Sequence, residues 1–289
     1  MSVDPYMREL MDQAGLPDGV SWWDLDAPLE GRTIGRVLTS ADPSLSPGDL
    51  VLHRKGWRTH GLVEASTVRV LPRHAGVPLT AYLSVLGGTG LTAYVALTRT
   101  LRLQPGEDLF VSAAAGGVGT AVGQFARLVG AGRIVGSAGS PLKVERLVKD
   151  LGFDAAFDYH DGPVSDLLTS AAPDGLDTAV ENVGGDHLEA AIGSLRDFGR
   201  IAWVGAVAQY HSSTHPRPPR ATSSTWSESP CAWKACWSAT TRTPSRSWRT
   251  SRSRIYAPEH WCRRKRWSTV SRTSPPPSWG RCGATTWGR

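Results

Sequence analysis

The feature that most constrains the fold is the run FVSAAAGGVGTAVGQFARL at residues 110–128. An apolar stretch breaks there into small residues and resumes with helical periodicity. Ala113, Gly116 and Gly119 give the spacing A-x-x-G-x-x-G, which is the dinucleotide-binding fingerprint with alanine in the first glycine position. Small residues let the backbone approach a pyrophosphate, and a helix N-terminus favours its negative charge. The structural alternative is a helix packed closely on a strand without a ligand.

A regular alternation of strand and helix patterns surrounds this run. Strands are expected at residues 108–113, 133–138, 155–159, 177–183 and 200–205, and helices at 119–130, 141–152, 163–172 and 186–199, the last with Gly199 as its stop. Five strands alternating with four helices predict an α/β fold with a doubly wound parallel Rossmann sheet. Right-handed crossovers place the carboxyl ends of the strands at one edge, where ligands bind. Upstream, residues 31–72 predict a small β region and residues 80–100 predict helix.

The composition changes sharply near residue 210. Residues 1–210 carry 17 Lys and Arg against 24 Asp and Glu, whereas residues 211–289 carry 15 against 2. The first segment contains no cysteine, which fits a reducing cytoplasm. Eight of the twelve tryptophans but only two aliphatic core formers, Ile255 and Val270, lie in the second segment. Nothing reads as a signal peptide or a membrane span, so no membrane association is expected.

The choice of nicotinamide cofactor depends on the segment GSAGSPLK at residues 136–143. An NAD site usually places Asp or Glu near this point for the ribose 2′-hydroxyl. The segment has no acidic residue and ends in Lys143, which suits the 2′-phosphate of NADPH. A solvated lysine in the first turn of a helix is the alternative.

Five motifs follow one another as they do in a known family: SVDPYMR at 2–8, VLGGTGLTAY at 85–94, VSAAAGGVG at 111–119, ENVGG at 181–185 and WVGAVAQY at 203–210. Together they resemble the NADPH-dependent enone reductases. These form a zinc-free branch of the medium-chain dehydrogenase/reductases that includes prostaglandin and alkenal double-bond reductases. The resemblance covers roughly residues 1–220. It implies hydride transfer from NADPH to the C=C bond of α,β-unsaturated ketones or aldehydes, with a quinone reductase of the same superfamily as the alternative.

The resemblance also implies the domain organisation. We expect a partial GroES-like catalytic domain at 1–88, an NADP-binding Rossmann domain at 89–210 and an aberrant basic tail at 211–289. The tail should be largely disordered, because it has few aliphatic residues and many Ser, Pro and Arg. The family has a further segment before SVDPYMR, so either the start codon is assigned too late or the first domain is incomplete. Family members are often dimers, which leaves a homodimer as an open expectation.

Site residues follow from the resemblance in the same way. The glycine turn would hold the pyrophosphate, Lys143 and Tyr159 the 2′-phosphate end, and Asn182, Gly205 and Thr92 the nicotinamide half. Tyr210 and Tyr6 would face the substrate as catalytic residues. Tyr210 would then donate a hydrogen bond to the oxygen on which negative charge develops. The full set of cofactor-binding candidates is Thr92, Ala115, Gly116, Gly117, Val118, Gly119, Gly139, Lys143, Tyr159, Asn182 and Gly205. Each has a plain structural alternative, such as a turn former for Asn182.

Two signals in the tail are interpreted as accidental. The basic run CRRKRW at 262–267 resembles a nucleic-acid patch, but no nucleic-acid partner is expected. A zinc alcohol dehydrogenase needs cysteine ligands, and residues 1–210 contain none, so no metal site is expected. The four cysteines do not have the spacing of a zinc finger: Cys231, Cys236, Cys262 and Cys282.

The tail departs from the family after Tyr210, and the genetic code offers a reason. When the third base of each codon is read with the first two of the next, Trp233–Lys234 becomes glutamate and residues 221–241 become compatible with the family. Residues 278–288 likewise become compatible with its closing LRGDNVG motif. The hypothesis is a frameshift between about residues 211 and 219. An inactive, frameshifted chain is therefore the alternative to an active reductase.

Overall fold

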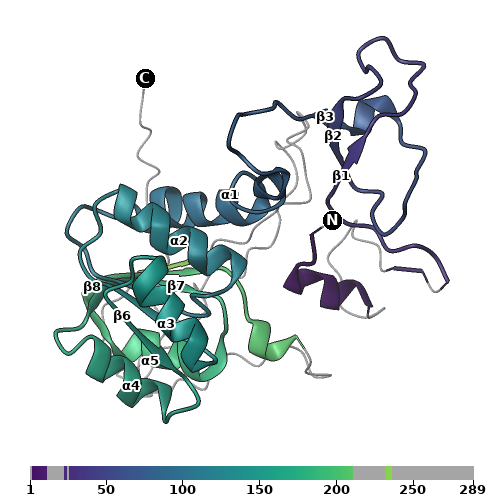
Figure 1. The fold of residues 1–289 in the computed structure, drawn as a ribbon. Coiled ribbons are helices and arrows are strands. Elements are labelled where there is room, and N and C mark those ends of the chain that lie inside the picture. The colour runs from purple at the N-terminus through teal and green to yellow at the C-terminus, as the bar shows by residue number, and fades with distance from the viewer. Residues whose placement is uncertain (1, 12–22, 25, 211–231, 236–289) are drawn as a thin grey trace, which may run out of the picture. The chain divides into compact units, whose positions relative to one another are not determined.

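The computed structural model describes residues 2–11, 23–24, 26–210 and 232–235 (Figure 1). All described residues belong to one compact unit. The expectations for the four cysteines and for the basic run at 262–267 lie outside the described residues. Among the described residues, no helix is both long and apolar enough to cross a membrane.

The amino-terminal region contains a small antiparallel sheet, which confirms the predicted β region. β1 (Thr33–Arg36) pairs with β2 (Leu50–His53), and β2 pairs with β3 (Arg69–Val70). Leu71 and Tyr82 complete its buried cluster together with residues of β2. Three short 3-10 helices belong to this region: η1 (Pro5–Met11), η2 (Ala65–Thr67) and η3 (Leu79–Leu83).

The large sheet has six parallel strands in the order β6-β5-β4-β7-β8-β9. They are β4 (Leu109–Val111), β5 (Ile134–Ala138), β6 (Ala155–Asp158), β7 (Leu176–Glu181), β8 (Leu195–Trp203) and β9 (Ala232–Ala235). The connecting helices are α2 (Gly117–Leu128), α3 (Pro141–Asp150), α4 (Val164–Ala171) and α5 (Gly185–Gly193). This is the Rossmann strand order, and it reverses between β4 and β7. The predicted doubly wound α/β fold is confirmed.

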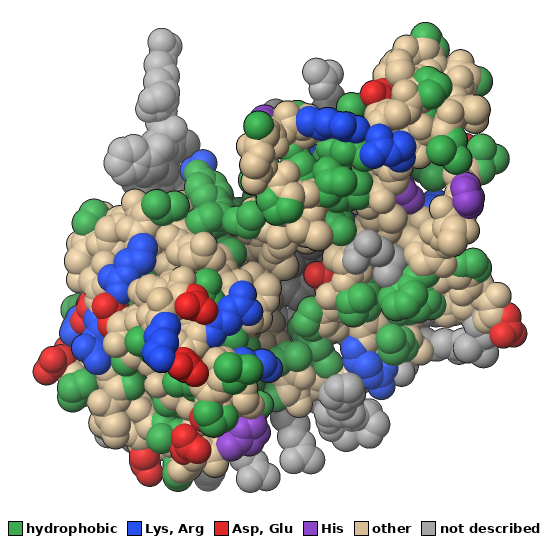
Figure 2. Space-filling model, in the orientation of Figure 1, with side chains coloured by type: hydrophobic (Ala, Val, Ile, Leu, Met, Phe, Trp, Pro, Cys, Tyr) green, Lys and Arg blue, Asp and Glu red, His purple; other side chains and the backbone are tan. Residues whose placement is uncertain are grey.

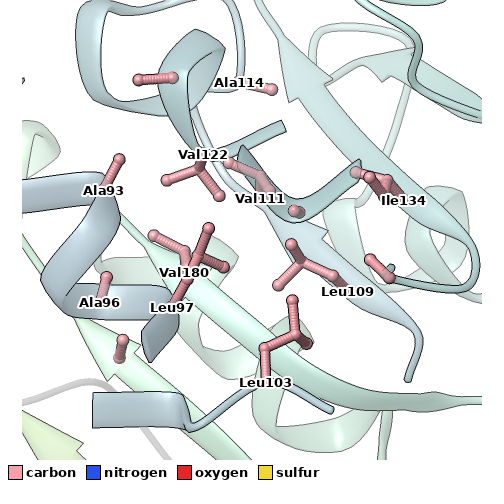
Figure 3. Close-up of a cluster of buried hydrophobic side chains, with 14 of the residues drawn as sticks. Ala93, Ala96, Leu97, Leu103, Leu109, Val111, Ala114, Val122, Ile134 and Val180 are labelled. Atoms are coloured by element: carbon pink, nitrogen blue, oxygen red, sulfur yellow. The ribbon is translucent and has the colours of Figure 1, made fainter. Parts of the chain in front are cut away.

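Apolar side chains cover both faces of this sheet. Every residue of β4 and β5 is buried, as expected for parallel strands with helices on both sides. On one face, Val111, Val122, Ile134 and Val180 meet the helix α1 (Gly88–Val95) and the π-helical segment η4 (Ala96–Leu101) that continues it (Figure 3). A second cluster, built around Phe110, fills the other face. The predicted helix at 80–100 is thus confirmed for its second half.

The predicted helix at 186–199 is confirmed in its first half, but its predicted end is wrong. α5 ends at Gly193 rather than Gly199, and β8 begins at Leu195. The side chain of Arg196 forms ion pairs with two aspartates beside the amino ends of β4 and β7. These long-range contacts hold the segment against the sheet, and helical periodicity alone does not reveal them.

β9 lies in the tail that was expected to be largely disordered. Its backbone pairs with β8 from Arg200 to Trp203. The rest of the tail lies outside the described residues, so its disorder stays a prediction, as do the domain boundaries at residues 88 and 210.

Acidic and basic side chains are mixed over the face that carries α3 and α4 (Figure 2). Several of them pair, such as Lys149 with Glu145 and Arg127 with Asp154. Mixed charge of this kind is typical of an ordinary solvated surface.

Candidate functional site

The glycine turn after β4 lies at the point where the strand order reverses. Ala113 has a φ of 47°, in the left-handed region that favours glycine. Gly116 is the N-cap of α2, and no side chain caps this end of the helix. Gly116 and Gly117 are exposed, with Ala115 and Val118 half-buried beside them. The first N–H groups of α2 are therefore available to an anion such as a pyrophosphate.

Gly119 has a different role from its exposed neighbours. It is buried, and a Cβ there would lie 2.5 Å from the carbonyl oxygen of Ala113 and 2.6 Å from the Cα of Ala114. Only glycine allows α2 to pack this closely on the turn. The predicted cofactor-binding role of Gly119 is thus indirect, through helix packing.

The candidates for the adenosine end follow β5 and β6. Tyr159 lies beside Gly139, since a Cβ on Gly139 would be 2.7 Å from the tyrosine hydroxyl. The Tyr159 ring contacts His160, with centroids 4.2 Å apart, and His187, with centroids 5.3 Å apart. Lys143 is exposed in the first turn of α3. The structure thus brings Gly139, Tyr159, His160 and His187 together, and the role of Lys143 at the adenosine end stays a prediction.

The candidates for the nicotinamide end lie where β7 and β8 finish. The backbone N–H of Asn182 donates to Ser112 Oγ at 2.7 Å, and Asn182 Nδ2 donates to the Ser112 carbonyl oxygen at 2.7 Å. A Cβ on Gly205 would lie 3.2 Å from the Tyr210 hydroxyl and 3.3 Å from the Asn182 carbonyl oxygen. The structure therefore brings Asn182, Gly205 and Tyr210 together.

Two titratable groups near the candidate site are buried. Glu181 is fully buried, and burial raises the pKa of its carboxyl to about 7, although hydrogen bonds from Gly184 and Val183 oppose the change. Burial lowers the pKa of His187 to about 4, with Asp186 acting in the opposite direction. His187 Nε2 is buried and has no hydrogen-bond partner among the described residues.

Sequence reasoning missed three polar residues at this site: Thr89, Ser112 and Glu181. Thr89 Oγ1 is buried without a partner among the described residues, and its methyl group would contact a Cβ on Gly117 at 3.1 Å. All three lie in the motifs quoted above. The available signal was a polar residue at the end of a buried apolar strand, or beside a helix start.

Two other candidates lie on separate elements. Thr92 is buried on α1 at 5% exposure, which fits a packing role as well as a contact with the nicotinamide. Tyr6 lies half-buried on η1, and its place at the substrate stays a prediction. No group of three or more His, Cys, Asp or Glu side chains suited to a metal occurs in the described part of the chain.

Two family models match the chain, one described as the N-terminal domain of oxidoreductase over residues 1–71 and one as zinc-binding dehydrogenase over residues 117–234. The 2-alkenal reductase (NADP(+)-dependent) of Nicotiana tabacum is 39% identical over 214 residues, covering 73% of this chain and 61% of the relative. Prostaglandin reductase 1 of Rattus norvegicus is 40% identical over 222 residues, covering 76% and 64%.

A solved structure agrees with these matches. CurA from Vibrio vulnificus in complex with NADPH aligns with a TM-score of 0.71 at 28% identity, covering 82% of this chain and 70% of that one. The chain spans somewhat less than two thirds of the length of the curated relatives named above. Residues 117–234 therefore belong to a zinc-binding dehydrogenase family domain with the Rossmann strand order, and this agrees with the resemblance to medium-chain dehydrogenase/reductases.

Proposed function

We propose that the chain is an NADPH-dependent reductase of α,β-unsaturated ketones or aldehydes. The observation that carries the proposal is an uncapped glycine turn after β4, where the strand order reverses, with Asn182 bonded to Ser112 just before the turn and itself beside Gly205, which lies next to Tyr210. Relatives named as an alkenal reductase and a prostaglandin reductase support it. The name of the family includes zinc, but the described residues do not fit a zinc site, and no step here uses a metal.

Bound NADPH would supply a hydride to the β-carbon of the substrate. Negative charge would then develop on the carbonyl oxygen, and a neutral hydrogen-bond donor must stabilise it. The Tyr210 hydroxyl is a neutral donor beside Gly205 and Asn182, and Tyr6 is proposed as a second residue facing the substrate. The backbone N–H groups at the start of α2 would bind the pyrophosphate and orient the cofactor.

Lys143 and Tyr159 are proposed to select NADPH over NADH. Lys143 is exposed at the start of α3, and the segment 136–143 that ends with it has no acidic residue to repel a 2′-phosphate. Lys149 is an exposed lysine on the same helix that pairs with Glu145, so it serves as a matched control.

The test is titration of the full chain with NADPH and with NADH, with nicotinamide fluorescence as the signal for binding. Lys143→Ala should weaken NADPH binding at least about tenfold, since hydrogen bonds to charged groups contribute about 1.5–3 kcal/mol, and leave NADH binding unchanged. Lys149→Ala should change neither. Absence of NADPH binding by the wild type, or equal loss of both cofactors in Lys143→Ala, would contradict the proposal.

Activity is measured as NADPH consumption with a simple enone, and a quinone is the comparison substrate. Turnover of the quinone but not of the enone would support the alternative function, a quinone reductase of the same superfamily.

We also propose a cytoplasmic location, since residues 1–210 contain no cysteine, and a homodimer, which rests on the resemblance alone. The acidic balance of residues 1–210 supports the absence of a nucleic-acid partner.

A further inference from the structure

Glu181 is a fully buried carboxyl that the mechanism above does not use. It is the last residue of β7 and stands directly before Asn182. Its Oε1 accepts hydrogen bonds from the backbone N–H groups of Val183 at 2.7 Å and Gly184 at 2.8 Å. One carboxyl oxygen thus holds the two amides that follow Asn182.

Ser112 joins the turn after Glu181 to the neighbouring strand β4. It is the residue after β4, and its side chain is fully buried. Its hydroxyl accepts the backbone N–H of Asn182 at 2.7 Å, and its carbonyl oxygen accepts a hydrogen bond from Asn182 Nδ2 at 2.7 Å. Asn182 therefore follows one buried polar residue, Glu181, along the chain and is hydrogen-bonded to another, Ser112, from the neighbouring strand.

The same turn holds the segment that leads to Tyr210. The Glu181 carbonyl oxygen accepts hydrogen bonds from Val204 at 2.8 Å and Gly205 at 3.2 Å. The carbonyl oxygens of residues 182 and 183 accept from residues 207 and 208, each at 3.1 Å. Any displacement of the turn would thus also displace the backbone that carries Gly205 and Tyr210.

We propose that Glu181 and Ser112 are positioning residues that hold the turn at 182–184, and through it residues 204–210, in the conformation that receives the nicotinamide. The inference rests on the proposed function. It assigns the two residues to the nicotinamide end of the cofactor only. The adenosine end, at Gly139, Lys143 and Tyr159, follows β5 and β6, and in the described part of the chain no hydrogen bond links it to either residue.

The test compares NADPH with adenosine 2′,5′-bisphosphate, which lacks the nicotinamide, in titrations of the full chain. Glu181→Ala leaves two buried amides without their acceptor. It should weaken NADPH binding about tenfold, or about 1.4 kcal/mol, and change binding of the bisphosphate by less than about twofold. Glu181→Gln keeps an acceptor oxygen and should restore most of the NADPH affinity. Ser112→Ala should show the same selective loss, and it carries the test if circular dichroism shows that Glu181→Ala does not fold.

Thr178→Val is the matched control, because Thr178 is fully buried on the same strand but its hydroxyl donates to the Asp108 carbonyl oxygen near the opposite end. It should leave both affinities unchanged. Equal loss of both ligands in the Glu181 and Ser112 variants, or no loss of NADPH, would overturn the positioning role while leaving the proposed function intact. A wild type that binds neither ligand would refute both.

Discussion

Replacing Glu181 with glutamine keeps the shape of a fully buried side chain and removes its titration. Burial raises the pKa of this carboxyl from 4.5 to about 7. Below pH 4.5 the carboxyl is protonated in both the folded and the unfolded chain. As the pH rises from 4.5 to 7, the unfolded chain releases the proton while the folded chain retains it. The free energy of unfolding of the wild type must therefore fall over this range.

The size of the effect follows from the two pKa values. The difference between 7 and 4.5, at about 1.4 kcal/mol for each pH unit, gives about 3 kcal/mol. His187 acts in the opposite direction, because burial lowers its pKa from 6.5 to about 4 and its contribution is lost as the pH falls through that range. Since His187 is present in both proteins, the difference between wild type and Glu181→Gln isolates the carboxyl.

The assay is urea unfolding at a series of pH values from 4.5 to 7, with far-ultraviolet circular dichroism as the measure of the folded fraction. Relative to the wild type, Glu181→Gln should gain about 3 kcal/mol across the series. A difference between the two proteins that does not change with pH would refute the reasoning. It would mean that the carboxyl is solvated or paired with a cation in the folded chain.

Two further substitutions test the geometry of the sheet. Gly119→Ala should lower the free energy of unfolding by about 1–3 kcal/mol and weaken NADPH binding. The reason is that the alanine Cβ would lie within 2.6 Å of backbone atoms. An unchanged urea midpoint would contradict the close packing of α2. Arg196→Ala should lower the free energy of unfolding by about 1 kcal/mol, since its partly exposed guanidinium pairs with Asp108 at 2.8 Å and Asp177 at 2.6 Å. Added salt should reduce that loss, and a loss independent of salt would assign it to packing instead.

Local patterns predicted the elements between residues 108 and 183 closely. Pro141 begins α3 as expected, with Ser140 as its N-cap. The apolar runs at β4 and β5 are buried strands, because a parallel sheet covered by helices has no polar face. The prediction failed at α5, where helical periodicity continued past Gly193 but an ion-paired Arg196 holds the chain against the sheet.

The candidate site divides in the same way. Gly116 and Gly117 could be predicted, since their spacing after a strand is itself the signal. Ser112 and Glu181 gave only a weak signal, a polar residue at the end of an apolar strand. Their importance lies in contacts between residues far apart in the sequence, such as the bond from Asn182 to Ser112, which is 70 residues away. A motif describes neighbours along the chain, whereas a buried carboxyl acquires its pKa and its partners from strands that meet only in the folded sheet.

The sequence by itself determined the class of fold and the position of the glycine turn, because strand and helix periods and small residues act over short distances. Only the tertiary structure decided which residues meet at the turn. The strand order places β4 beside β7, so that Ser112, Glu181 and Asn182 share one hydrogen-bond network with Gly205. Burial of that network, which depends on the packing of both faces of the sheet, then sets the charge of Glu181.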